Sequence, residues 1–370
     1  MAIPASPTST VHASTLRADP SRLDEVFDRL RARVAAGALP SAAIAIGDAD
    51  GEIARMAFAP ADKPLSPDSA FFLASVTKPI FATAFMQLIE AGRVDLHGAV
   101  EDLLPEFNSG ADPQKRRVTW WHLLTHTSGV PDVSPDVIRR SRPSAKRMTE
   151  MTLAAPLDFE PGARYEYCTA TFYLMARAIE RVSGLAYARH LQERVLDPLG
   201  MEATFDARKS RRPIVAVQGV GVENRLVRFV VVRYLAAAAL PGGGLFGTLD
   251  DLLRFGAAMI RPVDGGVPIS RTTFDLMAKD HLAGQVRGSW DDEESPVHFG
   301  LSWGKPTLMR DMPGSPSTVS HGGATGTRLW IDPETELVFV FFTNQWGQDR
   351  GPEVEAIRGI YRAMGWPDRP

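Results

Sequence analysis

The sequence predicts a mixed α/β (α+β) fold, in which helices flank an antiparallel sheet and a mostly helical domain is inserted between the two parts of that sheet. Two observations support this prediction. Strand patterns occur near both ends of the 370-residue chain and form hairpins around short turns, whereas the stretch between them carries mainly helical spacing. Because hairpins join antiparallel neighbours, we expect a mainly antiparallel sheet.

The N-terminal part is predicted to contain a tail, a helix, a hairpin and an apolar helix. Residues 1–20 are rich in Pro, Ser and Thr and are typical of a flexible tail. Residues 21–36 place apolar side chains on one helical face, and residues 41–59 form two strand patterns around a glycine-containing turn. A nearly all-apolar helix is expected over about 76–91, where Gly92 ends it.

The rest of the chain completes this plan. Helical spacing occurs at 119–126, 169–184, 187–200 and 270–280, and Thr248 to Asp251 is a variant capping box that opens a further helix. Strand patterns at 327–332 and 337–344 flank a turn, and a helix over about 352–365 follows. We therefore expect a sheet domain from 21–95 and 290–370 and a mostly helical domain from 96–289, with 205–240 forming part of a cleft wall.

Composition excludes several functional classes. The formal net charge is −3 and no basic block stands out, which disfavours nucleic acid and anionic membranes as partners. Cys168 is the only cysteine, so an internal disulfide and a cysteine-rich zinc site are excluded. No apolar run reaches the roughly 20 residues of a membrane helix, and the N-terminus lacks the pattern of a secretory signal. We expect a cytoplasmic protein.

The pattern Ser-x-x-Lys, which can hold a nucleophile and its base, occurs twice. Ser302 and Lys305 lie beside Gly304 and Pro306, which disfavour a helix, so this pair is expected in a loop or at a strand edge. Ser75 and Lys78 differ, because Pro79 is tolerated only in the first helical turn. The helix must therefore begin near Ser75, which puts the two side chains on one face and Ser75 at the positive end of the helix dipole. Burial of this helix is expected to lower the pKa of Lys78 and make it a plausible base, although an N-cap serine with a snorkelling lysine is the alternative.

Other catalytic arrangements are less well supported. The chain has no Gly-x-Ser-x-Gly elbow. His122 and His126 are spaced to share a metal, but no glutamate base lies between them, so packing or hydrogen bonding is the preferred interpretation. The stretch 242–247 matches Gly-x-Gly-x-x-Gly but follows Pro241 without a βαβ unit, and we interpret it as a turn before Thr248. We expect no metal and no organic cofactor.

Two further stretches carry polar groups suited to a cleft. Tyr165 and Tyr167 stand two residues apart on an extended approach to a helix, so one of them can face a cleft or merely form a hydrogen bond. The glycine-rich stretch 320–326 precedes a strand pattern. Glycines there indicate close approach by another backbone or a ligand, with a plain loop or bulge as the alternative.

Taken together, five ordered blocks resemble the class C β-lactamase-like serine hydrolases, a family that includes family VIII carboxylesterases, DD-peptidases and D-aminopeptidases. The blocks are LASVTKP, HLLTHTSGVP, PGARYEY, PGGGLFGTLDDLLRFG and HGGATGTRLWIDPETELVFVFFTN, and they span about residues 70–345. The resemblance implies the β-lactamase/penicillin-binding-protein fold, with the site between a sheet domain and a helical domain.

The resemblance also implies roles for individual residues. Ser75 would be the acylated nucleophile and Lys78 its partner, with Tyr167 at the position of the family's Tyr-x-Asn tyrosine. Lys78 and Tyr167 can share the proton transfer, and their coupled titrations leave open which one is the base. The oxyanion hole would be the backbone N–H groups of Ser75 and Ala324.

The substrate-binding positions depart from the lactamase pattern. His321, followed by Gly322 and Gly323, replaces the family's Lys-Thr-Gly triplet, and Thr169 stands where asparagine is common. A neutral imidazole pairs poorly with a carboxylate at pH 7, and threonine lacks the amide that contacts a substrate amide. Both departures favour neutral acyl esters over β-lactams and peptides.

The sequence therefore predicts a serine carboxylesterase that hydrolyses short-chain, small-molecule esters through an acyl-enzyme on Ser75. A β-lactamase or a D-amino-acid peptidase or amidase on the same machinery is the first alternative. Acyl transfer to an acceptor other than water is the second, and a non-catalytic binding protein that keeps the fold is the third.

Overall fold

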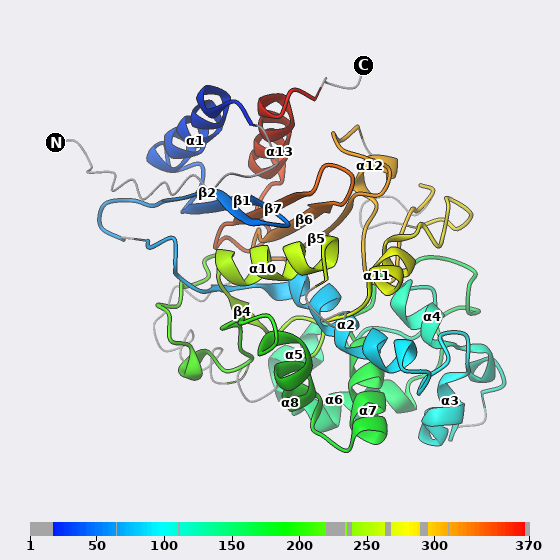
Figure 1. The fold of residues 1–370 in the computed structure, drawn as a ribbon. Coiled ribbons are helices and arrows are strands. Elements are labelled where there is room, and N and C mark those ends of the chain that lie inside the picture. The colour runs from blue at the N-terminus through cyan, green and yellow to red at the C-terminus, as the bar shows by residue number, and fades with distance from the viewer. Residues whose placement is uncertain are drawn as a thin grey trace.

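The computed structural model describes residues 18–63, 65–109, 112–219, 234, 239–262, 268–288, 295–309 and 311–366. Most of the predicted tail and much of the predicted cleft wall over 205–240 lie outside these residues. Figure 1 shows the sheet in the upper half of the view and most of the helices below it.

The main sheet has five antiparallel strands in the order β2-β1-β7-β6-β5, so N-terminal and C-terminal segments form one sheet. A second, two-stranded sheet pairs β3 with β4. The strands are β1 Ala42–Asp48, β2 Gly51–Phe58, β3 Phe71–Phe72, β4 Phe246–Gly247, β5 Val319–Gly322, β6 Arg328–Asp332 and β7 Leu337–Phe342. This confirms the predicted mixed fold and its antiparallel sheet, whereas the predicted domain boundaries stay a prediction.

The predicted helices are present, with some differences in length. The helices of the described residues are α1 Pro20–Ala35, α2 Thr77–Glu90, α3 Val100–Leu103, α4 Trp120–Leu124, α5 Pro135–Ser141, α6 Ala145–Ala154, α7 Thr171–Ser183, α8 Tyr187–Leu191, α10 Leu249–Ile260, α11 Arg271–Ala278, α12 Pro306–Met309 and α13 Gly351–Ala363. The helix predicted over 119–126 is shorter because His126 has a left-handed φ of 58°. The helix predicted over 187–200 continues from α8 as a π-helical turn, Gln192–Leu196.

Alternating side chains bury both faces of the sheet. Ile44, Phe339 and Phe341 pack in one cluster with α1 and α13, whereas Ala45 and Val340 join the larger cluster that includes α10. Figure 1 shows α1 and α13 on one side of the sheet and α10 on the other. The period of two along β1 and β7 thus produces a three-layered arrangement.

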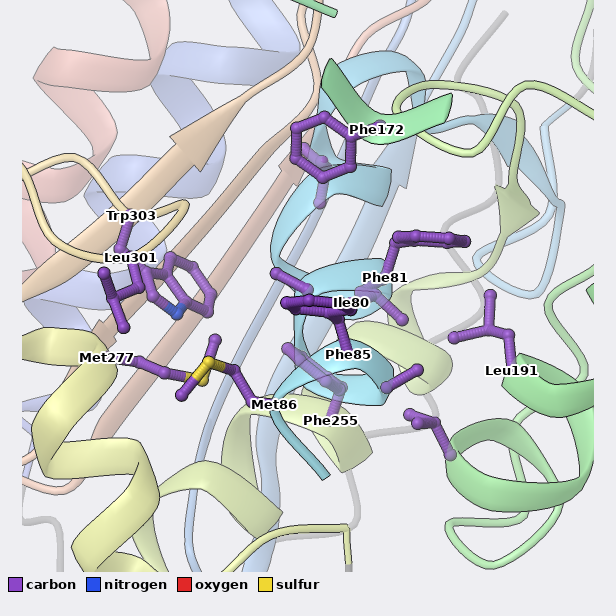
Figure 2. Packing of buried hydrophobic residues seen from close by; sticks show 14 of the residues in the cluster. Ile80, Phe81, Phe85, Met86, Phe172, Leu191, Phe255, Met277, Leu301 and Trp303 are labelled. Atoms are coloured by element: carbon purple, nitrogen blue, oxygen red, sulfur yellow. The ribbon is translucent and has the colours of Figure 1, made fainter. Parts of the chain in front are cut away.

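Helix α2 lies at the centre of the larger cluster. Figure 2 shows Ile80, Phe81, Phe85 and Met86 of this helix among side chains from α7, α8, α10 and α11. Such a helix is held rigidly by close packing on all sides. No helix in the described part of the chain is both long and apolar enough to cross a membrane.

Candidate functional site

Ser75 occupies a tight turn immediately before α2. A 3₁₀ turn, Ala74–Val76, precedes the helix, so the predicted start near Ser75 is correct to within two residues. Every residue from Phe71 to Met86 is buried except Ser75, which is partly exposed. Ala74 has a φ of 47°, a conformation that is unfavourable for a residue other than glycine. The backbone thus presents a single hydroxyl to solvent at the front of a buried helix.

The pairing of β3 with β4 brings a distant glycine-rich segment to this turn. The Leu73 N–H donates to the Leu245 carbonyl at 2.9 Å, and the Leu245 N–H donates to Thr77 Oγ1 at 3.2 Å. As a result the Gly242 carbonyl lies 2.7 Å from Lys78 Nζ. The prediction that this segment is a turn leading to the capping box at Thr248 is confirmed, because Thr248 and Asp251 form the reciprocal pair of hydrogen bonds.

Lys78 is fully buried and its amine has three oxygen neighbours. Nζ lies 3.3 Å from Ser75 Oγ, 3.2 Å from Thr169 Oγ1 and 2.7 Å from the Gly242 carbonyl oxygen. Burial lowers the pKa of Lys78 to about 7, although the negative charge of Asp132 opposes this shift. The predicted desolvation of this lysine is therefore confirmed, and a large fraction of the amine is neutral at neutral pH.

Tyr167 approaches from the extended segment before α7. Its ring lies under the Lys78 amine, with Nζ 4.6 Å from the ring centroid. Burial raises the pKa of the Tyr167 phenol well above its usual value, and a hydrogen bond with Ser75 opposes this shift. The phenol is therefore protonated at neutral pH, and it interacts with the Ser75 hydroxyl.

His321 faces this group from the edge strand β5. Its ring centroid lies 6.2 Å from that of Tyr167. Burial lowers the pKa of His321 to about 3, so the ring is neutral. Nδ1 lies 3.0 Å from the Gly322 carbonyl oxygen, and because a carbonyl can only accept, Nδ1 carries the proton and Nε2 keeps its lone pair.

The loop after β5 is fastened to the turn that carries Ser75. Thr325 Oγ1 donates to the Phe72 carbonyl and Thr327 Oγ1 to the Leu73 carbonyl, both at 2.8 Å. A Cβ at Gly323 would lie 2.4 Å from the Leu73 carbonyl oxygen, so only glycine fits this approach. The predicted close backbone approach is confirmed, and Ala324 is held beside the turn.

Comparison with known proteins agrees with this geometry. The family model described as Beta-lactamase matches residues 26–361. The chain belongs to the beta-lactamase family. Esterase EstB of Burkholderia gladioli is 30% identical over 372 residues, covering 88% of this chain and 90% of that protein. Penicillin-binding protein 4 of Amycolatopsis lactamdurans is 27% identical over 338 residues, covering 88% of this chain and 85% of that one.

A solved structure supports the fold independently. The structure titled EstCE1, a hydrolase with promiscuous acyltransferase activity, superimposes with a TM-score of 0.75 at 20% identity, covering 92% of this chain and 99% of that one. This likeness shows the beta-lactamase-family fold. It agrees with the antiparallel sheet and the flanking helices described above.

Within this beta-lactamase-family fold, the structure brings together Ser75, Lys78, Tyr167, Thr169 and His321, whose sequence positions span almost 250 residues. Thr169 is predicted to bind substrate, and in the structure its Oγ1 lies 3.2 Å from Lys78 Nζ. Cys168 points elsewhere, because its side chain packs in a separate cluster with Val133 and Met148, where burial raises its pKa.

Sequence reasoning missed three neighbours of this group: Gly242, His126 and Asp132. Gly242 acts through its carbonyl, which no side-chain pattern reveals. His126 was predicted to pack or form hydrogen bonds, which is confirmed, but its contact with Tyr167 was not foreseen. Asp132 accepts the N–H groups of Thr169 and Ala170 at 2.9 and 3.0 Å, and an exposed carboxylate in a loop gives no such signal in a sequence.

Proposed function

We propose that this protein is a serine carboxylesterase that cleaves short-chain esters through an acyl-enzyme on Ser75. One observation carries the proposal: the fully buried amine of Lys78, with a pKa near 7, lies 3.3 Å from Ser75 Oγ. Ser75 is the one residue from Phe71 to Met86 that is partly exposed, so a substrate can reach it. Family membership supports the serine hydrolase class. The proposal keeps the cytoplasmic location expected from the sequence.

Lys78 is the base that takes the proton from Ser75. A neutral amine has two N–H bonds and one lone pair. The Gly242 carbonyl and Thr169 Oγ1 accept the two N–H bonds, at 2.7 and 3.2 Å, which leaves the lone pair for the Ser75 hydroxyl. The serine oxygen then attacks the ester carbonyl while its proton moves to Nζ.

Tyr167 carries the proton onward to the leaving alcohol. Its raised pKa keeps the phenol protonated, and its ring lies against the Lys78 amine that also contacts Ser75 Oγ. When the tetrahedral intermediate collapses, the C–O bond to the alcohol breaks, the phenol protonates the departing oxygen, and Lys78 reprotonates the phenolate. Water then attacks the acyl-enzyme by the same route in reverse, which releases the acid and restores Ser75.

The backbone N–H groups of Ser75 and Ala324 form the oxyanion hole. Supporting this assignment, Thr325 and Thr327 fasten the loop containing Ala324 to the turn containing Ser75. Within the described residues, the Ala324 N–H takes part in no backbone hydrogen bond, although its carbonyl accepts from Gly347 at 2.9 Å. Each such donor contributes about 10²–10³-fold to the rate of acyl transfer.

The side chains predicted to bind substrate, His321 and Thr169, are uncharged at neutral pH, which favours neutral esters as substrates. With a pKa near 3, His321 offers no positive charge to a substrate carboxylate at pH 7. Thr169 is engaged with Lys78 and lacks a side-chain amide. The relative named as an esterase supports this choice, whereas the relative named as a penicillin-binding protein supports the peptidase alternative.

The test is a substrate panel with the wild-type protein. Initial rates are measured on p-nitrophenyl butyrate and on a chromogenic cephalosporin, with Ser75→Ala as the matched control for each. We expect ester cleavage that depends on Ser75 and exceeds lactam turnover by about 10²-fold or more, a ratio typical of a missing charge-assisted contact. Rapid lactam turnover with negligible ester cleavage would contradict the proposal.

A further inference from the structure

The residues on either side of Tyr167 are both hydrogen-bonded to His126. The Glu166 N–H donates to the His126 carbonyl at 2.9 Å, and the Cys168 N–H donates to His126 Nδ1 at 3.1 Å. One residue from the loop after α4 therefore holds the backbone before and after Tyr167. This fixes the extended segment independently of α7.

The imidazole also packs directly on the phenol ring. The centroids of the His126 and Tyr167 rings lie 4.6 Å apart with an angle of 33° between their planes. His126 is only 1% exposed, and the rings of Tyr165 and Phe299 close around it at 5.9 and 5.5 Å. Such contact fixes the tilt of the Tyr167 ring as well as its backbone.

The tautomer of His126 follows from these contacts. Because Nδ1 accepts an N–H, the ring proton must be on Nε2. Burial, together with the positive charge that Lys78 can carry, holds the pKa of His126 well below its usual value, so the ring is neutral. Within the described part of the chain, Nε2 has no hydrogen-bond partner.

A buried N–H without a partner is unfavourable, so His126 does not serve stability through Nε2. Its backbone adds a further cost, because a φ of 58° is uncommon for residues other than glycine, even though histidine, asparagine and aspartate adopt it more often than the rest. Nδ1 and the ring face, in contrast, both contact the segment around Tyr167. These costs are typical of a residue whose geometry serves a site.

We propose that His126 is a positioning residue that fixes the phenol of Tyr167 against Ser75 through its Nδ1 acceptor and its ring face. This inference rests on the proposed function of Tyr167 in proton transfer. His126 does not contact the reacting atoms itself. It acts through Tyr167.

Two substitutions separate the acceptor from the rest of the side chain. In His126→Asn, the amide oxygen stands near the position of Nδ1 and asparagine tolerates positive φ, so the Cys168 N–H keeps its partner. In His126→Leu, the volume remains but the acceptor is lost. His126→Gln serves if the leucine variant does not fold, because its amide reaches the Nε2 position instead. His122→Leu is the matched control, since His122 lies one turn earlier and, among the described residues, its side chain forms hydrogen bonds only with Thr119.

The readout is kcat per active site, with the number of sites counted by complete fluorophosphonate labelling. If His126 had a purely structural role, its substitution would lower the number of labelled sites but leave kcat per labelled site unchanged. We expect His126→Leu or His126→Gln to lower per-site kcat about 10²-fold with KM little changed, as for a misplaced catalytic group. We expect His126→Asn to stay within about fivefold of wild type, and His122→Leu to lower the Tm without changing per-site kcat.

Two results would overturn the inference. One is a wild-type per-site kcat in His126→Leu or His126→Gln, and the other is an equal loss in the asparagine and leucine variants. Ser75→Ala tested in parallel distinguishes this from failure of the proposed function. If Ser75→Ala keeps ester cleavage, the function is wrong, whereas an inactive Ser75→Ala beside a fully active His126→Leu contradicts only the role of His126.

Discussion

The chain contains the same four-residue pattern twice, at Ser75–Lys78 and Ser302–Lys305, and the structure gives the two copies different surroundings. Ser75 is partly exposed on a turn before a helix and lies 3.3 Å from Lys78 Nζ. Ser302 is fully buried on a bend with a φ of 62°, and within the described residues its hydroxyl has no partner. Gly304 pairs with Ser320 at the edge of β5, which confirms the loop or strand edge predicted for this copy.

A perturbed lysine does not distinguish the two copies. Burial lowers the pKa of Lys78 to about 7 and that of Lys305 to about 8. The difference lies in the neighbours. Lys78 contacts a serine that substrate can reach, whereas Lys305 is influenced by Asp280, Asp332 and Glu334, and donates no side-chain hydrogen bond to the residues that the structure describes. A depressed lysine pKa therefore indicates a base only beside an accessible nucleophile.

The largest expected effect separates the two serines. Ser75→Ala removes the nucleophile and is expected to lower kcat for a p-nitrophenyl ester by about 10⁴–10⁶-fold, the range seen when a nucleophilic serine is removed. Ser302→Ala removes a buried hydroxyl without a partner in the described residues, so activity should stay unchanged and the Tm should stay equal or rise. Steady-state kinetics and thermal unfolding measure both. Loss of activity in Ser302→Ala with an unchanged Tm would show that Ser302 takes part in catalysis, which would contradict the comparison.

A second test compares the two lysines through the pH profile. Lys78 accepts a proton only when neutral, so log kcat/KM of the wild type should rise with pH and level off above a midpoint near 7. Lys78→Met should lower kcat about 10³-fold, in the range of general-base catalysis. Lys305→Met should keep both the rate and the midpoint. A midpoint near 8 that disappears in Lys305→Met would show that Lys305, and not Lys78, is the group whose titration controls the rate.

The smallest effect concerns the neighbours that orient Lys78. Thr169→Val keeps the shape of the side chain but removes the acceptor 3.2 Å from Nζ. Loss of about 1 kcal/mol of hydrogen bonding should lower kcat roughly fivefold with little change in KM. Thr171→Val is a matched control two residues later, at the first residue of α7, where Oγ1 donates to the Cys168 carbonyl. An equal loss in both variants would show that packing, and not the acceptor, is responsible.

The fold was largely predictable because its strands and helices are strongly patterned. The hairpin over 41–59, the apolar helix after Ser75 and the capping box at Thr248 each depend on local periodicity or local hydrogen bonds, and all three are confirmed. The helices α5 and α6 were not predicted. Their sequences are polar and short, so packing within the fold, and not an apolar face, decides that they form.

The site was predictable only where side chains carry the chemistry. Ser75, Lys78 and His321 stand out as residue types in ordered blocks, and the structure brings them together. The Gly242 carbonyl could not be predicted, because every residue has one and only the pairing of β3 with β4 selects this one. His126 was visible as a histidine, but its hydrogen bonds on both sides of Tyr167 arise from tertiary structure.

The most direct test of the comparison is intact-protein mass spectrometry during turnover of a slowly hydrolysed activated ester, followed by peptide mapping. The wild type and Ser302→Ala should each gain the mass of one acyl group, located on the peptide that carries Ser75, and Ser75→Ala should gain none. An adduct mapped to any other residue, or ester turnover that persists in Ser75→Ala, would contradict the account.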